Sequence, residues 1–453
     1  VFQMKYQSNP NNPLLKEPKF KQKNDKPVRN DAAFYNAWKY VFLVVIFSGV
    51  LAFGICFLLR NYGVGRENRE FQTMSEEDGE ICDKKVIGYF SESHTSEITI
   101  NHISKLTHAV FAFVIMKSDG TVMFRDKLAQ ERFLKIRDIA NQASPKLKML
   151  ISIGGPANSD NFLPVISSPD RKKIFINSIV SFLKKYDIDG VDLFWKWPRL
   201  EDKYYYSRFI SMLKERFQME EKNYILSIII PPCGFGGWNN KFDIENIVAV
   251  ADFINIYSMD YYGPWKNPYG NPTGPISPIY NGAQGREAYN VHSSALTYSC
   301  KVKQSKKFNI VIPFFARLWK NVEKPIQHPG REVYRNVHLV HGSAVGESFM
   351  SRKSVLEKGY KLNSYSYDEL SRSAFIYNST TKEYLTFETE KSIEAKVNYV
   401  KDRALAGVWI WFVDLDDEEN SLINAVNFTG LCSSGDTLKF DCHQKKSKSF
   451  AYL

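Results

Sequence analysis

One short segment of the chain combines a buried strand pattern with polar side chains at every second position. It runs Asp189-Gly-Val-Asp192-Leu-Phe194-Trp-Lys196. Successive residues of a strand point to opposite faces, so Asp192, Phe194 and Lys196 share one face. The opposite face is apolar and suited to packing. A carboxylate and an amine on one strand face, with an aromatic ring between them, indicate a former active site.

This segment resembles the signature strand of family 18 glycoside hydrolases, the chitinases, whose pattern is D-G-x-D-x-D-x-E. Asp189 and Asp192 match the pattern, whereas Phe194 stands at its third aspartate and Lys196 at its glutamate. In that family the glutamate is the acid and base, and two of the aspartates assist it. The resemblance implies a chitinase-like protein in which these motif positions no longer supply a catalytic residue.

Three other motifs occur in the order that the family has them. The S-x-G-G motif appears as Ser152-Ile-Gly-Gly155, an earlier segment reads Phe111-Ala-Phe113, and Trp411-Phe-Val-Asp-Leu-Asp-Asp417 is similar to W-x-x-D-x-D-D. Each motif alone is a weak signal. Together they extend the resemblance over most of residues 83 to 431.

Two motifs depart from the family at positions that hold the substrate. The family's M-x-Y-D appears as Tyr257-Ser-Met259-Asp260, and Arg317 follows an alanine where the family has Y-G-R. In the family, that tyrosine and the signature's third aspartate hold the N-acetyl group whose carbonyl oxygen attacks the anomeric carbon. Met259 has no hydrogen-bond donor for this task.

Glycoside cleavage requires a carboxylic acid to protonate the leaving oxygen, a step worth roughly 10²- to 10⁴-fold in rate. Lys196 is a poor replacement, because its ordinary pKa is about 10.4 and its charge would oppose the cation that develops. Asp192 lies four residues earlier, roughly 13 Å along a strand. We therefore expect no hydrolysis unless a carboxylate such as Asp192 or Asp260 reaches the bond.

A carbohydrate-binding protein needs no such acid, because a sugar ring stacks on an aromatic plane. Trp411, at the position of the tryptophan that lies under the cleaved sugar in the family, is the first candidate. Trp265 and Trp319 follow, although both could equally be core or rim residues. The sequence thus favours binding of chitin or N-acetylglucosamine-containing glycans, at a site with Asp260, Met259 and Arg317. An active hydrolase on chitin-type substrates and a platform for protein signalling remain alternatives.

Eight short apolar runs alternate with helical patterns from residue 83 onward. Helices are clearest at 127–140, 171–186, 204–219 and 393–403, where apolar residues recur at spacings of three and four. Eight such units predict an α/β fold, a parallel (β/α)8 TIM barrel whose sites lie at the carboxyl ends of the strands. The predicted strands are 86–90, 107–115, 147–155, 188–195, 224–231, 252–260, 308–315 and 407–414.

Residues 316–390 separate the seventh strand from its helix and are too many for a simple connection. Within them, residues 374–377 and 384–387 flank a polar turn and predict a hairpin. Chitinase-type members of family 18 carry a small α+β insertion at this point. We expect such an insertion here, forming one wall of the cleft.

The chain before the barrel divides into three parts. Residues 1–39 are polar and rich in proline, which is typical of a disordered tail. Residues 40–59 contain no charged residue, and twenty residues of helix reach about 30 Å, the thickness of a bilayer's hydrocarbon core. We expect a transmembrane helix there, followed by a stalk over residues 60–82.

Basic residues are more frequent before the predicted span than after it, which places the tail in the cytoplasm. The expected protein is a single-pass type II membrane protein with its barrel in a lumen or outside the cell. Asn378 and Asn427 begin N-x-[ST] sequences and are candidate glycosylation sites on that side.

The net charge of +11 is concentrated in the two tails, without a basic stripe between them, so nucleic acid is not expected as a partner. No C-x-x-C pair occurs among the six cysteines, and the eight histidines are scattered. These features predict no metal site. No cofactor is expected either.

Cys82 and Cys432 flank the predicted barrel, just before its first strand and just after its last helix. Strands begin and their helices end at the same side of such a barrel, so the two cysteines should meet. We predict a disulfide between them, with Cys442 in the tail of residues 432–453 as a rival partner for Cys82.

Overall fold

A computed structural model describes residues 82–94, 96–143, 146–234, 237–326, 331–432 and 437–442. The predicted tail 1–39, transmembrane helix 40–59 and nearly all of the stalk lie outside the described residues. Of the helices that the structure describes, none has the length and apolar character needed to cross a bilayer.

Eight parallel strands form the closed barrel that the sequence predicts. Neighbouring strands pair in the order β1-β16-β8-β7-β6-β5-β4-β2, and pairing of β1 with β2 closes the ring. The signature segment therefore lies on the fourth strand of the barrel. In chain order the strands are β1 (Lys85–Ser91), β2 (His108–Met116), β4 (Lys148–Gly154), β5 (Gly190–Phe194), β6 (Ile225–Ile230), β7 (Phe253–Ile256), β8 (Phe308–Pro313) and β16 (Gly407–Trp411).

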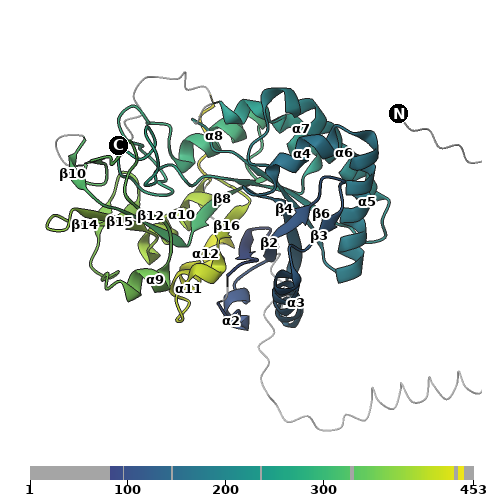
Figure 1. Ribbon diagram of the computed structural model, residues 1–453, viewed down its shortest axis with the longest axis horizontal. Coiled ribbons are helices and arrows are strands. Elements are labelled where there is room, and N and C mark those ends of the chain that lie inside the picture. The colour runs from purple at the N-terminus through teal and green to yellow at the C-terminus, as the bar shows by residue number, and fades with distance from the viewer. Residues whose placement is uncertain are drawn as a thin grey trace, which may run out of the picture. The chain divides into compact units, whose positions relative to one another are not determined.

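Helices lie around the barrel strands (Figure 1). The four helical patterns found in the sequence correspond to α3, α5, α6 and α10. The helices outside the insertion are α2 (Ile100–Ile103), α3 (Lys127–Gln142), α4 (Phe162–Ile166), α5 (Pro169–Tyr186), α6 (Lys203–Gln218), α7 (Ile244–Val250), α8 (Val291–Val302), α10 (Glu390–Asp402), α11 (Ser421–Ala425) and α12 (Phe428–Cys432).

Capping side chains define where the longer helices begin. Asp126 accepts a hydrogen bond from Ala129 N at 2.8 Å at the start of α3, and Asn290 does the same for Ser293 N at 2.8 Å at the start of α8. Each bond satisfies a backbone donor that has no partner within the helix. Helix α5 ends at Asp187, which adopts the left-handed conformation common at helix ends.

The signature strand needs its glycine for close packing. A Cβ on Gly190 would lie 2.2 Å from the carbonyl oxygen of Ile225 on β6. Every residue of β5 is buried, because the barrel interior covers one side and the helices cover the other. The close packing of β5 against β6 thereby positions the residues that follow β5, including Lys196, at the end of the barrel.

The predicted insertion is a five-stranded antiparallel sheet in the order β12-β9-β15-β14-β13, with a separate β10-β11 pair. It lies to one side of the barrel (Figure 1). Residues 374–378 and 383–387 form the predicted hairpin. Its elements are β9 (Phe315–Trp319), β10 (Val322–Pro325), β11 (Arg335–Val337), β12 (Gly346–Ser351), α9 (Arg352–Glu357), β13 (Ser366–Asp368), β14 (Ser373–Asn378) and β15 (Glu383–Phe387).

The predicted seventh strand, 308–315, extends past the observed strand into the next one. Strand β8 ends at Pro313, and Phe315 already belongs to β9, which pairs with β12 and β15 in the other sheet. The apolar run continues without a break in sequence, because both sheets bury it. Arg317 is thereby carried by the insertion.

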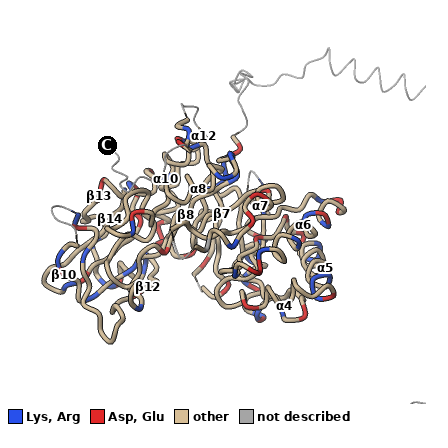
Figure 2. Tube along the Cα trace, turned by 90° about the horizontal axis from the view of Figure 1, so that it is seen from above, with Lys and Arg blue, Asp and Glu red and all other residues tan. Residues whose placement is uncertain are grey.

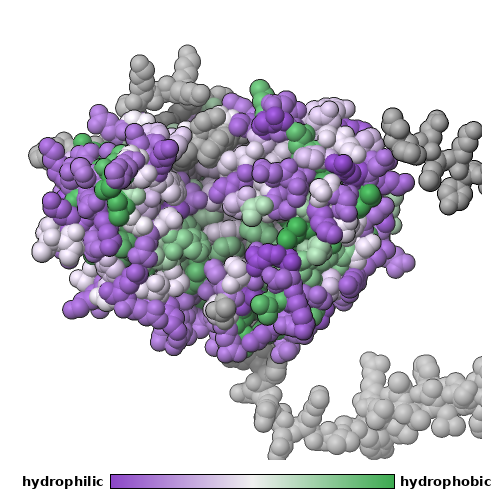
Figure 3. All heavy atoms as spheres, viewed as in Figure 1, coloured by the Kyte–Doolittle hydropathy of each residue, from purple (hydrophilic) through white to green (hydrophobic). Residues whose placement is uncertain are grey.

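Charged residues of both signs occur on the insertion and on the helices of the opposite side (Figure 2). A space-filling view shows a hollow near the centre of one face, where apolar residues gather (Figure 3).

Two disulfides tie down the segments that flank the barrel. Cys82 is bonded to Cys432, and Cys300 to Cys442. The predicted pairing of Cys82 with Cys432 is found, and Cys442, the rival partner for Cys82, is bonded to Cys300 instead.

Candidate functional site

The polar groups of the candidate site come from the carboxyl ends of different strands. Lys196 follows β5, and Tyr257 and Asp260 follow β7, while Arg317 is supplied by β9 directly after β8. In a parallel barrel these ends meet on one face, which is where the sites of such folds lie. The four side chains form one connected cluster.

Asp260 is the centre of this cluster. Its Oδ1 accepts a hydrogen bond from Arg317 Nη2 at 2.5 Å, and its Oδ2 accepts one from Tyr257 Oη at 2.5 Å. Burial by itself would raise the pKa of this carboxyl, but the charges of Arg317 and Lys196 and these hydrogen bonds outweigh it and lower the pKa. Asp260 is therefore ionised at neutral pH.

Lys196 reaches the cluster through Tyr257. Its Nζ donates a hydrogen bond to Tyr257 Oη at 2.8 Å and lies 4.4 Å from the centroid of that ring. The distance from Nζ to Asp260 Oδ2 is 3.8 Å, within ion-pair range. The pKa of Lys196 is lowered overall, because burial and the charge of Arg317 outweigh the attraction of Asp260.

Arg317 is fixed by three acceptors. Besides Asp260, it donates to Tyr262 O at 2.6 Å and Ser348 O at 2.9 Å, and only 5 % of its side chain is exposed. Its guanidinium carbon lies 4.5 Å from the ring of Trp265, a cation–π contact. Arg317 thus holds both Asp260 and one aromatic wall of the site in place.

A cavity of about 230 Å³ opens in front of this cluster. Only Lys196 and Asp260 among its lining residues are charged; the others are aromatic or apolar. The remaining members are Trp197, Pro232, Tyr257, Met259, Trp265 and Tyr269.

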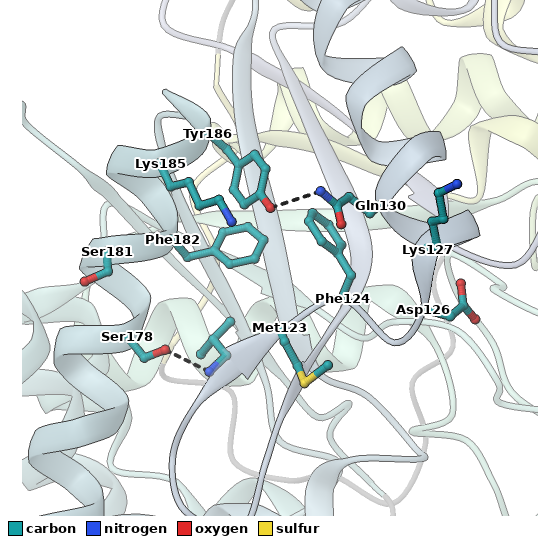
Figure 4. A pocket seen from close by; sticks show the side chains of 11 residues that line it. Met123, Phe124, Asp126, Lys127, Gln130, Ser178, Ser181, Phe182, Lys185 and Tyr186 are labelled. Carbon is teal, nitrogen blue, oxygen red and sulfur yellow. Dashed lines mark hydrogen bonds between the residues drawn. The ribbon is translucent and has the colours of Figure 1, made fainter.

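A larger hollow of about 490 Å³ lies away from the strand ends, between α3 and α5 beside β3 (Val122–Met123). Figure 4 shows the rings of Phe124, Phe182 and Tyr186 gathered there, with Gln130 donating to Tyr186 Oη at 3.4 Å. The hollow is on the outside of the barrel, so it has none of the convergent loops that build sites in this fold. The smaller cavity, with its two half-buried charged residues, is the better candidate.

Asp192 is absent from that cavity. It is fully buried inside the barrel, where its two oxygens accept hydrogen bonds from Ser152 Oγ at 2.7 Å and Ser227 Oγ at 2.6 Å. Burial raises its pKa to about 6, and the serine hydrogen bonds oppose this shift. Pairing of Lys196 with Asp192 is thus not found, and Asp260 is the carboxylate near the ammonium.

Asp189 lies at the other end of β5. It accepts a hydrogen bond from Met149 N at 2.9 Å and lies within ion-pair range of Lys222 and Lys148. Because β5 runs from this end to Lys196, Asp189 is remote from the cavity. Its place in the motif reflects a structural role in joining β4 to β5.

Phe194 and Trp411 fill the space between the barrel core and the cavity. Their ring centroids are 6.1 Å apart, and each also contacts Phe113. Phe194 has no exposed surface, and Trp411 is only 8 % exposed. Aromatic neighbours pack around the ring of Trp411 and it does not line the cavity of about 230 Å³, so its role in sugar stacking stays a prediction.

Trp319 is a core residue. It is fully buried in the insertion, where its Nε1 donates to Gly270 O at 3.2 Å and its ring contacts Tyr384. Trp265, in contrast, is half-buried and lines the cavity. Of the two tryptophans that were open to either reading, one is core and one lies at the site.

Sequence reasoning missed four of the residues that line the cavity: Trp197, Pro232, Tyr257 and Tyr269. Tyr257 lies two positions before Met259 in the same motif, so the pattern Y-x-M-D exchanges the two side chains of the family's M-x-Y-D. Trp197 directly follows Lys196, and Tyr269 lies in the long loop after β7. The exchange of side chains at positions 257 and 259 was visible in the sequence, whereas the place of Tyr269 at the cavity was not.

Comparison with known proteins agrees with the fold and motifs. The family model for glycosyl hydrolases family 18 matches residues 85–416. Human chitinase-3-like protein 2 is 27 % identical over 329 residues, which cover 69 % of this chain and 80 % of that protein.

Solved structures are similar over the same region. Human YKL-39 has a TM-score of 0.65 at 24 % identity, and the Group IV chitinase of Ostrinia furnacalis has a TM-score of 0.65 at 20 % identity; each match covers 77 % of this chain and 100 % of the other. With the family model covering residues 85–416, this chain belongs to glycosyl hydrolase family 18.

Proposed function

We propose that this protein binds N-acetylglucosamine-containing oligosaccharides of the chitin type in the cleft at the strand ends and does not hydrolyse them. The observation that carries the proposal is the lysine at the signature position of the family's catalytic acid, where the ammonium of Lys196 lies 2.8 Å from Tyr257 Oη. An ammonium at that position is a weak acid for protonating the leaving oxygen. Its positive charge also opposes the cation that develops on the sugar.

Neither nearby carboxylate is suited to replace the acid. Asp260 has a lowered pKa and holds no proton to donate at neutral pH, because Arg317 and Lys196 favour its charged form. Asp192 is fully buried and both its oxygens are engaged by serines. Among the described residues that line the cavity, Asp260 is the one carboxylate.

The family's acetamide-holding groups are also changed. Phe194 offers no hydrogen bond, and Met259 is a buried thioether. Binding alone remains feasible, because the cavity presents aromatic side chains, and aromatic faces suit the apolar faces of sugar rings. The solved relative YKL-39 is described as a pseudo-chitinase with retained chitooligosaccharide binding properties, which supports this combination.

A pair of matched variants tests where the sugar binds. Trp265→Ala removes an aromatic wall of the cavity, whereas Met123→Ala alters the outer hollow of Figure 4. We expect Trp265→Ala to weaken binding of chitotetraose about tenfold, since one aromatic contact is worth about 1 kcal/mol or more. Met123→Ala should leave the affinity unchanged, and the reverse result would move the site to the outer hollow.

We further propose that residues 40–59 anchor the chain in a membrane, with the barrel in a lumen or outside the cell. Disulfides form and persist in such oxidising compartments, and the barrel unit contains two of them. Asn378 and Asn427 are both exposed, as glycan acceptors must be. Protease protection of the barrel in sealed microsomes, with a mobility shift after removal of N-glycans, tests this; a barrel digested from the cytoplasmic side would contradict it.

A further inference from the structure

The charges of the cavity do not cancel. Asp260 is neutralised by Arg317, which contacts Oδ1 at 2.5 Å and is 5 % exposed. Tyr257 occupies Oδ2 at 2.5 Å, so Lys196 is held 3.8 Å away from that oxygen. One positive charge is therefore left over at the cavity wall.

Lys196 also has hydrogen-bonding capacity to spare. An ammonium has three donors, and Nζ makes a single hydrogen bond, to Tyr257 Oη, among the described residues. Tyr257 cannot supply countercharge, because burial raises its pKa well above the ordinary value and keeps it neutral. With 27 % of its side chain exposed, Lys196 can reach a ligand in the cavity.

The lining around Lys196 suits a small ring with an acidic substituent. Trp197 and Trp265 offer aromatic surface, and the cavity of about 230 Å³ is smaller than the roughly 300–1,000 Å³ of pockets that enclose drug-sized ligands. It has room for one sugar unit. Because the ammonium of Lys196 is half-buried and lacks a full countercharge, a ligand that carries a negative charge should bind it most favourably.

We propose that the cavity selects an acidic sugar unit, a uronic acid or another carboxylate-bearing residue within an N-acetylglucosamine-containing glycan, and that Lys196 binds its carboxylate. This inference rests on the proposed function and names the substrate class of the same site. The replacement of an acid by a lysine thus changes the sign of the charge that the site prefers.

Three tetrasaccharide probes test the charge preference on the full-length chain. The first alternates glucuronic acid with N-acetylglucosamine, the second is the same compound with its carboxylates methyl-esterified, and the third is neutral chitotetraose. In calorimetry at about 50 mM salt we expect the acid to bind at least about tenfold more tightly than its ester. The advantage should shrink as salt is raised, because salt screens charge attraction at a partly exposed site.

Variants of Lys196 assign the effect to this side chain. Lys196→Gln should remove the preference for the acid over its ester, and a near-UV circular dichroism spectrum that matches the unmodified chain reports an intact fold. Lys196→Arg retains the charge and should retain the preference. Equal binding of acid and ester by the unmodified chain, or a preference that survives Lys196→Gln, would overturn the inference.

The probes also separate this inference from the proposed function. If chitotetraose binds and the acid binds no better, the charge preference alone is wrong. If the acid binds and chitotetraose does not, the charge preference stands and the neutral chitin ligand is wrong. If none of the three probes binds, both proposals fail.

Discussion

The ammonium of Lys196 lies 2.8 Å from the hydroxyl of Tyr257 and 4.4 Å from the centroid of its ring. Tyr257 in turn donates to Asp260 at 2.5 Å, so the hydroxyl links the cation to the carboxylate. In the family pattern, the tyrosine would stand at position 259 and a glutamate at position 196. The two departures from the motifs are therefore in direct contact: Tyr257, two positions before the family's tyrosine, accepts a hydrogen bond from Lys196, which stands at the position of the glutamate.

Removing the charge of Asp260 should destabilise the fold. Asp260→Asn leaves Arg317 and Lys196 without their shared countercharge; because Asp260 is 24 % exposed, we expect a loss smaller than the cost of breaking a fully buried pair, about 3–5 kcal/mol. Urea unfolding followed by tryptophan fluorescence measures the loss. Asp138→Asn, on the exposed side of α3, is the matched control and should stay within about 0.5 kcal/mol. An equal, small effect of both variants would show that Asp260 does not compensate the two cations.

Asp192 should make stability depend on pH in an unusual direction. Burial raises its folded pKa from 3.8 to about 6, so the folded chain binds this proton more tightly than the unfolded chain. Its contribution therefore falls as pH rises from about 4 to about 6 and stays lost above that. A shift of about two pKa units corresponds to about 3 kcal/mol.

The Asp192→Asn variant isolates this contribution. The free energy of unfolding, measured by urea at several pH values, should decline more between pH 4 and 7 for the unmodified chain than for the variant. Parallel pH curves would mean that Asp192 has no raised pKa. One of the two serines can still donate to the asparagine oxygen, while the hydroxyl of the other can turn to accept from the amide nitrogen, so the variant should stay folded.

Both disulfides should contribute to stability, and to a similar extent. Cys82–Cys432 spans 350 residues and Cys300–Cys442 spans 142. Because loop-closure entropy grows only with the logarithm of length, the two contributions should differ by about 1 kcal/mol or less in the chain-entropy model. Double Cys→Ser variants and non-reducing peptide mapping test this. Mapping that finds Cys82 bonded to Cys442 would contradict the pairing.

The sequence was sufficient to predict the barrel and the departures from the family motif. Eight apolar runs with helices between them leave few other arrangements, and the residues at positions 194 and 196 are read directly. The exposure of single aromatic rings could not be predicted. Trp411 is covered because Phe194 and Phe113 pack beside it, and Trp319 is covered by the sheet of the insertion.

The cavity wall after β7 was equally beyond sequence reasoning. The loop that carries Trp265 and Tyr269 has no regular period, so its course depends on contacts with distant segments. Trp265 is placed by the guanidinium of Arg317, which comes from β9. Such a contact joins residues that no local pattern connects.

Restoring the acid should not by itself restore hydrolysis. In Lys196→Glu the new carboxylate would lie beside Asp260, and Phe194 and Met259 still could not hold an acetamide. Groups that act as one catalytic unit are strongly non-additive, so we expect little turnover of a chromogenic chitobioside. The triple variant Phe194→Asp, Lys196→Glu and Met259→Tyr should recover more than any single change. Substantial turnover by Lys196→Glu alone would show that the residues holding the substrate are misassigned.

The central claim is binding without cleavage, and one titration tests both halves of it. The full-length chain is titrated with chitotetraose in a calorimeter, and the contents are then analysed for shorter products by mass spectrometry after prolonged incubation. We predict saturable heat with the tetrasaccharide intact, because Lys196 stands where the acid is required. Release of chitobiose that increases with time would contradict the account, as would the absence of any saturable heat.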